Sequence, residues 1–205
     1  MIKRKFLLLL FLMILFKLAH SQSSKTEELF KTYLITDDDE TAKAIIKAND
    51  NLYSIYCQAI LTEDSSQQIT LLTKFINLKP KYGLAQAYFI RGTAYTISLK
   101  YDSAIVDYNK SIELDPAEDA TKFHFRSDAY LNIGDFDKAL ADANKEIQLT
   151  TKKAQPYVSR GVIYFKMQKY DLAIVDWKLA KKLDKDEAKD LDEMIESAKE
   201  EMNKQ

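Results

Sequence analysis

The chain is predicted to be all-α, a superhelix (solenoid) of stacked antiparallel helix pairs preceded by an N-terminal signal peptide. One set of residue types recurs three times, and the copies begin at Arg91, Arg126 and Arg160, 35 and 34 residues apart. Self-similarity at such a period is typical of stacked-repeat architectures. The chain also has only 4 Gly and 3 Pro, too few for a β-rich protein with many tight turns.

Each copy holds an arginine, a tyrosine 4 residues on, an aromatic residue 10 on, an alanine 13 on and an aspartate 16 on. The members are Arg91, Tyr95, Tyr101, Ala104 and Asp107; Arg126, Tyr130, Phe136, Ala139 and Asp142; and Arg160, Tyr164, Tyr170, Ala173 and Asp176. Apolar residues around them recur at three- and four-residue intervals, which predicts two helices per copy. In the first copy, Asp115-Pro116 ends the second helix because proline cannot continue it.

This pattern resembles the tetratricopeptide repeat, a 34-residue helix–turn–helix unit that stacks into a right-handed superhelix. The resemblance places repeats at 85–118, 120–153 and 154–187. Two residues depart from the pattern in the core of the middle repeat, where Ala143 and Glu146 replace a larger and a smaller residue.

The flanking segments are assigned from weaker patterns. Residues 49–82 are interpreted as a degenerate repeat, and 22–48 as N-terminal helices broken near 36–40, or a further degenerate repeat. Residues 188–205 are predicted to form a charged helix with one apolar stripe, which caps the exposed end of the stack.

The first 21 residues are predicted to be a secretory signal, because three basic residues precede an unbroken apolar run at 6–16. Small residues at Ala19 and Ser21 favour cleavage before Gln22. The alternative is an uncleaved membrane anchor, but Lys17 ends the run short of the roughly 20 apolar residues that a spanning helix needs. We therefore expect an exported protein, periplasmic or secreted, with no membrane insertion after cleavage.

Cleavage would remove four basic residues and no acidic one, so that 30 basic and 31 acidic residues become 26 and 31. The mature chain is then mildly acidic, with a net charge of about −5. A mildly acidic chain with interspersed charges offers no basic surface for nucleic acid, so we expect that it does not bind nucleic acid.

The recurring arginines and aspartates are interpreted as structural ion pairs that fix helix register. Catalytic or ligand-binding pairs are the alternative. The expected pairs are Arg91 with Asp107, Arg126 with Asp142, and Arg160 with Asp176. A spacing of 16 residues across an antiparallel hairpin brings the two side chains toward each other.

No catalytic, cofactor-binding or metal-binding pattern is recognisable, so we expect a protein that is not an enzyme and carries no cofactor. Cys57 is the only cysteine and has no histidine or basic cluster beside it, which favours a small buried hydrophobe. His124 is the only histidine after residue 21, and a lone histidine makes no zinc site. The acidic run 37–40 lacks the spacing of a calcium loop and fits a helix N-terminus.

The resemblance implies that the first helix of each pair lines a concave groove where a peptide binds. The implied lining is Gln86, Phe89, Ile90, Thr93, Ile97, Thr121, His124, Phe125, Asp128, Asn132, Gln155, Val158, Ser159, Val162 and Lys166. Relatives that grip acidic chaperone tails carry lysines, arginines and asparagines in such places. Here those places hold Phe89, Thr93, Phe125, Gln155 and Ser159, so we expect a ligand with apolar anchors instead.

The function expected from these observations is an exported scaffold or adaptor that binds a protein or peptide segment. Two alternatives remain open at this point. One is a structural subunit of a cell-envelope assembly, and the other is a membrane-tethered repeat protein held by residues 6–16.

Overall fold

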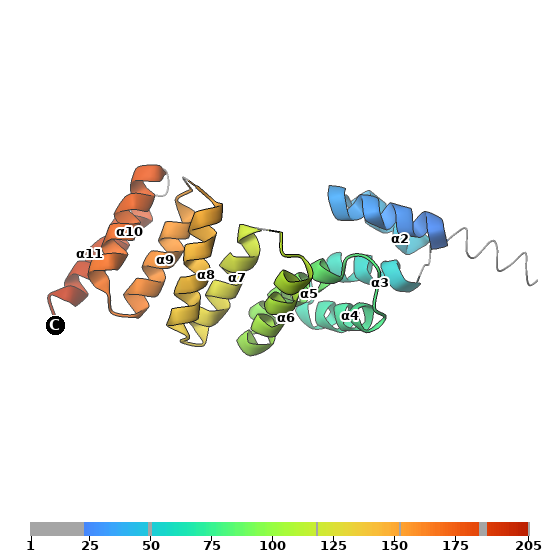
Figure 1. Cartoon of the computed structure of the whole chain (residues 1–205), viewed down its shortest axis with the longest axis horizontal. Helices are drawn as coiled ribbons and strands as arrows, with labels where there is room; N and C mark the ends of the chain where they lie inside the picture. The colour runs from blue at the N-terminus through green and yellow to red at the C-terminus, as the bar shows by residue number, and fades with distance from the viewer. Residues whose placement is uncertain (1–22, 49–50, 118, 152, 185–187, 205) are drawn as a thin grey trace, which may run out of the picture. The chain divides into compact units, whose positions relative to one another are not determined.

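The computed structural model describes residues 23–48, 51–117, 119–151, 153–184 and 188–204 (Figure 1). All regular structure in these residues is helical, so the predicted all-α class is confirmed. The chain divides into an N-terminal unit, Met1–Ala94, and a C-terminal unit, Tyr95–Gln205.

The N-terminal unit begins with a helix over 23–36, followed by α2 (Asp39–Lys47), α3 (Asn51–Ile60), α4 (Ser65–Asn77) and the first part of α5 (Leu84–Ile97). The helices before and after the acidic run are separated at 37–38, as expected. Asp38 caps α2, since its carboxylate accepts a hydrogen bond from the Thr41 backbone amide at 2.8 Å. Asp39 and Glu40 follow in the first turn, where their charge is favourable.

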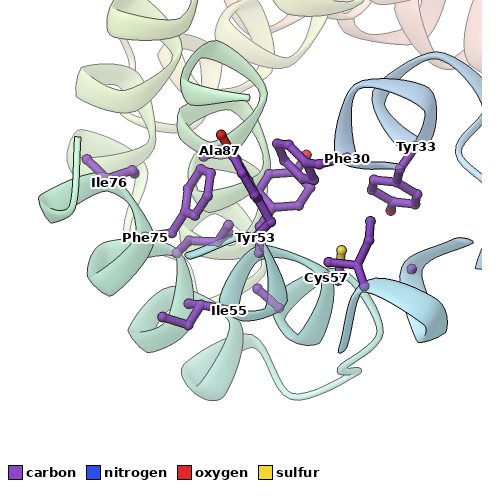
Figure 2. Packing of buried hydrophobic residues seen from close by; sticks show 13 residues of the cluster. Phe30, Tyr33, Tyr53, Ile55, Cys57, Phe75, Ile76 and Ala87 are labelled. Atoms are coloured by element: carbon purple, nitrogen blue, oxygen red, sulfur yellow. The ribbon is translucent and has the colours of Figure 1, made fainter. Parts of the chain in front are cut away.

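An aromatic cluster forms the core of the N-terminal unit (Figure 2). The ring of Phe30 stacks on Tyr53 at 4.3 Å between centroids and meets the ring of Tyr56 edge-on at 5.1 Å. Tyr56 in turn contacts Phe75 of α4 at 5.1 Å. Cys57 is fully buried among these residues, which confirms its assignment as a small buried hydrophobe.

The C-terminal unit continues from α5 through α6 (Tyr101–Leu114), α7 (Ala120–Asn132), α8 (Phe136–Leu149), α9 (Gln155–Lys166), α10 (Tyr170–Leu183) and α11 (Ala188–Met202). From α6 onward each helix packs against the next one in the chain (Figure 1). The helices of each hairpin are the two predicted for the repeat, and α8 against α9 joins one hairpin to its neighbour.

The turns that follow α5, α7 and α9 share one backbone conformation. Leu99, Gly134 and Gln168 have φ values of 57°, 80° and 60°. In each turn the next amide donates to a carbonyl five residues back, for example Lys100 to Tyr95 at 2.8 Å. This hydrogen bond is the Schellman pattern, which normally places glycine at the left-handed position.

A second core closes the C-terminal end of the chain, where Trp177 of α10 is 1% exposed. Leu191, Ile195 and Ala198 of α11 are buried against it, with Met194 partly buried beside them. These α11 residues therefore pack against the last hairpin. No helix in the part of the chain that the structure describes is long and apolar enough to cross a membrane. The predicted signal at 1–21 lies outside the described residues.

Candidate binding surface

Two of the recurring arginines bind their aspartates through both carboxylate oxygens. Arg126 donates from Nε and Nη2 to Asp142, and Arg160 donates in the same way to Asp176, with all four donor–acceptor distances at 2.7 Å. The side chains of Asp142 and Asp176 are only 7% and 4% exposed. Such bidentate, mostly buried pairs fix the two helices of a hairpin rather than offering charge to a ligand.

A third polar group from the preceding hairpin completes each arginine site. Nη1 of Arg126 donates to the Asn109 side chain of α6, and Nη1 of Arg160 donates to Asn144 of α8, both at 2.7 Å. The arginine thus binds its own hairpin and the one before it. Sequence reasoning missed these asparagines, although their spacing of 35 residues matches the repeat period.

The same arrangement extends into the N-terminal unit. Nη1 of Arg91 donates to Oγ1 of Thr73 in α4 at 2.9 Å, and Thr73 lies 36 residues before Asn109. The helix hairpin of α3 and α4 therefore supplies the same contact as the clear repeats. The expected partner of Arg91, Asp107, lies in the C-terminal unit, and the pairing of Arg91 with Asp107 stays a prediction.

Aromatic rings flank the arginines within their own helices. The guanidinium carbon of Arg126 lies 5.7 Å from the ring centroid of Phe123 and 6.0 Å from that of Tyr130. Arg160 lies 5.6 Å and 5.8 Å from Tyr157 and Tyr164. The cation therefore keeps favourable contacts on its faces while its edge is used for hydrogen bonds.

All fifteen residues of the implied groove keep part of their surface exposed. Ile90, Val158 and Val162 also pack against the two hydrophobic cores, and the ring of Phe125 contacts Tyr108 at 6.3 Å. These four side chains therefore stabilise the fold as well as lining a surface. Seven of the fifteen border one of three hollows. The other eight border none of these hollows: Thr93, Ile97, Phe125, Asp128, Asn132, Val158, Ser159 and Lys166.

The N-terminal unit has a hollow of about 310 Å³ beside α5. Gln86, Phe89 and Ile90 form one wall, and the other wall is Tyr33, Leu34, Asp37 and Tyr56. Burial and the adjacent Asp37 carboxylate raise the pKa of Tyr33. The phenol therefore stays protonated, and the hollow combines an apolar wall with one polar corner.

A second hollow, of about 250 Å³, lies at the N-terminal ends of α7 and α9. Three implied groove residues border it: Thr121, His124 and Gln155. The remaining lining is Ala120, Glu146, Thr150, Lys153 and Pro156. This is the most polar of the hollows that contain implied groove residues.

Glu146 and His124 form an ion pair inside this second hollow. Nδ1 of His124 lies 3.2 Å from the Glu146 carboxylate, and Nε2 lies 3.6 Å from Asp128. The hydrogen bond to Glu146 raises the pKa of His124 against the opposing effect of burial. Burial has the opposite effect on the carboxyl of Asp128 and raises its pKa, because burial disfavours the charged form.

This pair is specific to the middle repeat. At the positions of His124 and Glu146, the repeat before has Phe89 and Ser111, and the repeat after has Val158 and Ala180. Glu146, which stands out in the sequence as too large for its place, is buried there with only 6% exposed. Its charge is accommodated because the neighbouring helix supplies a histidine.

A third hollow, of about 310 Å³, opens between α9, α10 and α11. Val162 is the only implied groove residue that borders it. The other lining residues are Phe165, Trp177, Glu193, Met194 and Ser197. Its floor is apolar, and Glu193 supplies a carboxylate at the side of α11. Sequence reasoning missed this contribution of the capping helix.

The described residues contain no cluster of three or more histidine, cysteine or acidic side chains suited to hold a metal ion. Burial raises the pKa of the Cys57 thiol to about 12. That thiol therefore stays protonated near neutral pH and is a poor nucleophile.

Comparisons with known proteins agree with the repeat pattern. The family model for the tetratricopeptide repeat matches residues 85–118 and 154–187. Among curated proteins, none matches the sequence.

Solved structures with this fold are similar over much of the chain. A crystal structure of the MamA protein gives a TM-score of 0.62 at 22% identity, covering 83% of this chain and 96% of that one. The first tetratricopeptide domain of Spaghetti (RPAP3), bound to an HSP90 peptide, gives 0.53 at 24% identity, covering 58% and 93%. The TPR2B domain of yeast Sti1, in a complex with pHsp70, gives 0.52 at 22% identity, covering 57% and 96%. At these identities the likeness shows the fold, and together with the recurring motif and the two matched repeats it makes this chain a tetratricopeptide-repeat protein.

Proposed function

We propose that the chain is an exported scaffold that holds a segment of another protein against the exposed side of its first helices. The observation that carries this proposal is the position of the hollows. Each of the three described above is bordered by a first helix of a repeat and contains at least one implied groove residue. Concave, partly apolar hollows with a few polar groups are the usual form of a recognition site.

The hollows favour a segment with an apolar anchor. The site between α9 and α11 has Phe165, Trp177 and Met194 in its lining, which suits a leucine, methionine or aromatic side chain. The fold is shared with the Spaghetti domain bound to an HSP90 peptide. In this chain, the places where lysines, arginines and asparagines would grip an acidic tail hold Phe89, Thr93, Phe125, Gln155 and Ser159. Buried Glu146 and nearby Asp128 would repel an acidic tail, so we expect no such ligand here.

The experiment is a peptide selection against residues 22–205, followed by calorimetry on the peptides recovered. We expect affinities in the micromolar range, about −8 kcal/mol. Met194→Glu should weaken binding at least about tenfold, because it places a charge in the apolar hollow. Val106→Asp is the matched control, since Val106 is 65% exposed on a second helix. Equal loss with both variants, or none with either, would overturn the groove assignment.

Export is a separate part of the proposal, supported by the basic residues and apolar run at the N-terminus. Mass measurement of the protein from its native cell tests it. A chain that begins at Gln22 supports export with cleavage. An intact N-terminus in the membrane fraction would favour the tethered form, and co-fractionation with a large complex would favour an envelope subunit.

A further inference from the structure

Helix α10, the second helix of the last repeat, carries an exposed apolar stripe. The stripe lies outside the implied groove, which is assigned to first helices. Its members follow one another at intervals of three and four residues, so they lie along one side of the helix. They are Leu172, Val175, Leu179 and Leu183, with 39%, 60%, 36% and 37% of their surfaces exposed. The hairpin itself is held by other α10 residues, including the buried Ala173, Trp177 and Ala180.

The other second helices carry only part of this stripe: α6 has Val106 and Leu114 at the positions of Val175 and Leu183, with 65% and 41% of their surfaces exposed. At the positions of Leu172 and Leu179, α8 has Lys138 and Lys145. In α6 the same positions hold Ser103 and Lys110. The repeat fold therefore accepts polar residues at these places, and leucine is not needed there for packing within the repeat.

Charged residues flank the stripe in a self-complementary order. Asp171 lies at the N-terminal end of α10, and Lys178 and Lys182 lie toward the C-terminal end, all of them exposed. Lys181, by contrast, is already paired with Asp192 of α11 at 2.6 Å. If two α10 helices packed antiparallel through their stripes, Asp171 of each copy would lie near Lys182 of the other.

We propose that the α10 stripe is the interface of a two-fold symmetric homodimer in which the α10 helices of two copies pack antiparallel. A two-fold axis requires a surface that complements itself, and the stripe with its opposite end charges has this property. Flanking charges of this kind set partner and orientation in paired helices. Four apolar side chains make a small interface, so the dimer is weak and forms at high local concentration. The inference goes beyond the groove and does not depend on it.

Sedimentation equilibrium over a wide range of protein concentration tests the proposal. We expect the mature chain to shift from monomer to dimer as concentration rises. The double variant Leu172→Lys with Leu179→Lys should stay monomeric, and should keep its thermal stability because α8 carries lysine at both places. Ser103→Lys in α6 is the matched control and should leave the dimer unchanged. A wild-type chain that is monomeric throughout, or a lysine variant that still dimerises, would overturn the proposal.

A charge exchange tests the antiparallel arrangement. Asp171→Lys and Lys182→Asp should each weaken self-association roughly tenfold, because each creates two like-charge contacts. An equimolar mixture of the two variants should associate as strongly as the wild type, since the mixed dimer has two opposite-charge pairs, one with its native sign and one with its sign reversed. Association of the mixture no stronger than that of each variant alone would rule out this antiparallel arrangement.

Discussion

Gly161 of α9 lies directly beneath the indole ring of Trp177 in α10. A β-carbon at residue 161 would come within 2.6 Å of Cδ1 of that ring and within 2.9 Å of Cε2. The indole Nε1 donates a hydrogen bond to the Val158 carbonyl at 3.2 Å. The absence of a side chain at residue 161 therefore allows the largest side chain of the C-terminal core to be buried.

Gly161→Ala should lower the free energy of unfolding by about 1–3 kcal/mol, because the buried indole must move to make room. Helix propensity alone predicts the opposite sign, since alanine is favoured over glycine by about 1 kcal/mol in a helix interior. Urea unfolding followed by circular dichroism measures the change. The middle repeat has Ser127 and Ala143 at the two positions, so Trp177→Ala combined with Gly161→Ala should show less than additive loss. Full additivity would contradict this account.

Leu99→Gly and Gln168→Gly should each stabilise the protein by about 0.5–1 kcal/mol. Both residues have left-handed backbone angles, which cost roughly 1–2 kcal/mol for a residue with a side chain. Leu99 is 72% exposed, so little burial is lost with its side chain. Thermal unfolding gives the comparison.

The matched reverse change is Gly134→Ala, in the turn after α7. A β-carbon there would meet nothing within 4 Å, so the variant isolates the backbone effect. We expect it to destabilise by about 1 kcal/mol. Stabilisation by this variant, or destabilisation by both glycine variants, would show that these turns relax without strain.

The helices were predictable because their signals are local. Apolar spacing located the hairpins, Asp115-Pro116 marked one end, and the acidic run at 37–40 marked one start. The left-handed turns were not predicted, since only one of the three equivalent positions, Gly134, holds glycine. Leu99 and Gln168 adopt the same left-handed geometry although neither is glycine.

Contacts between hairpins were harder to predict than contacts within one. The pairing of Arg126 with Asp142 follows from a spacing inside one hairpin. Asn109 is polar and lies in the preceding repeat. Its contact with Arg126 could have been suspected only because asparagine recurs one repeat later, at residue 144. The pairing of His124 with Glu146 was also missed. Each of these two residues differs in type from its equivalents in the other repeats. The reason is visible only in the packed helices, where the histidine and the glutamate contact each other.

Substitutions at Asn144 and Asp176 should separate the contributions of the two side chains that bind Arg160. Asn144→Ala deletes one hydrogen bond to a charged donor and should cost about 1–2 kcal/mol of stability. Asp176→Ala leaves Arg160 without its carboxylate and should cost more, about 2–4 kcal/mol, since the arginine side chain is only 21% exposed. Chemical denaturation of both variants and of the double variant gives the coupling between them.

The exposed pair of Lys138 with Asp135 provides the control for this series. Its ends lie 2.6 Å apart, but the lysine side chain is 62% exposed. Lys138→Ala should therefore change stability much less than Asp176→Ala does, because solvent screens an exposed pair. Equal effects for Lys138→Ala and Asp176→Ala would mean that the recurring pairs do not hold the hairpins together.

The His124 and Glu146 pair should make stability depend on pH near neutrality. The hydrogen bond to Glu146 raises the folded-state pKa of His124 above its usual value near 6.5. The stabilisation is therefore fully present below that unfolded value and is lost as pH rises through the folded pKa. Titration of the His124 ring protons by NMR locates the folded pKa, and unfolding at several pH values measures the loss.

Glu146→Gln keeps the shape of the side chain but removes its charge, so it should lower the His124 pKa and flatten the pH dependence of stability. An unchanged His124 pKa in this variant would show that Glu146 does not hold the proton there.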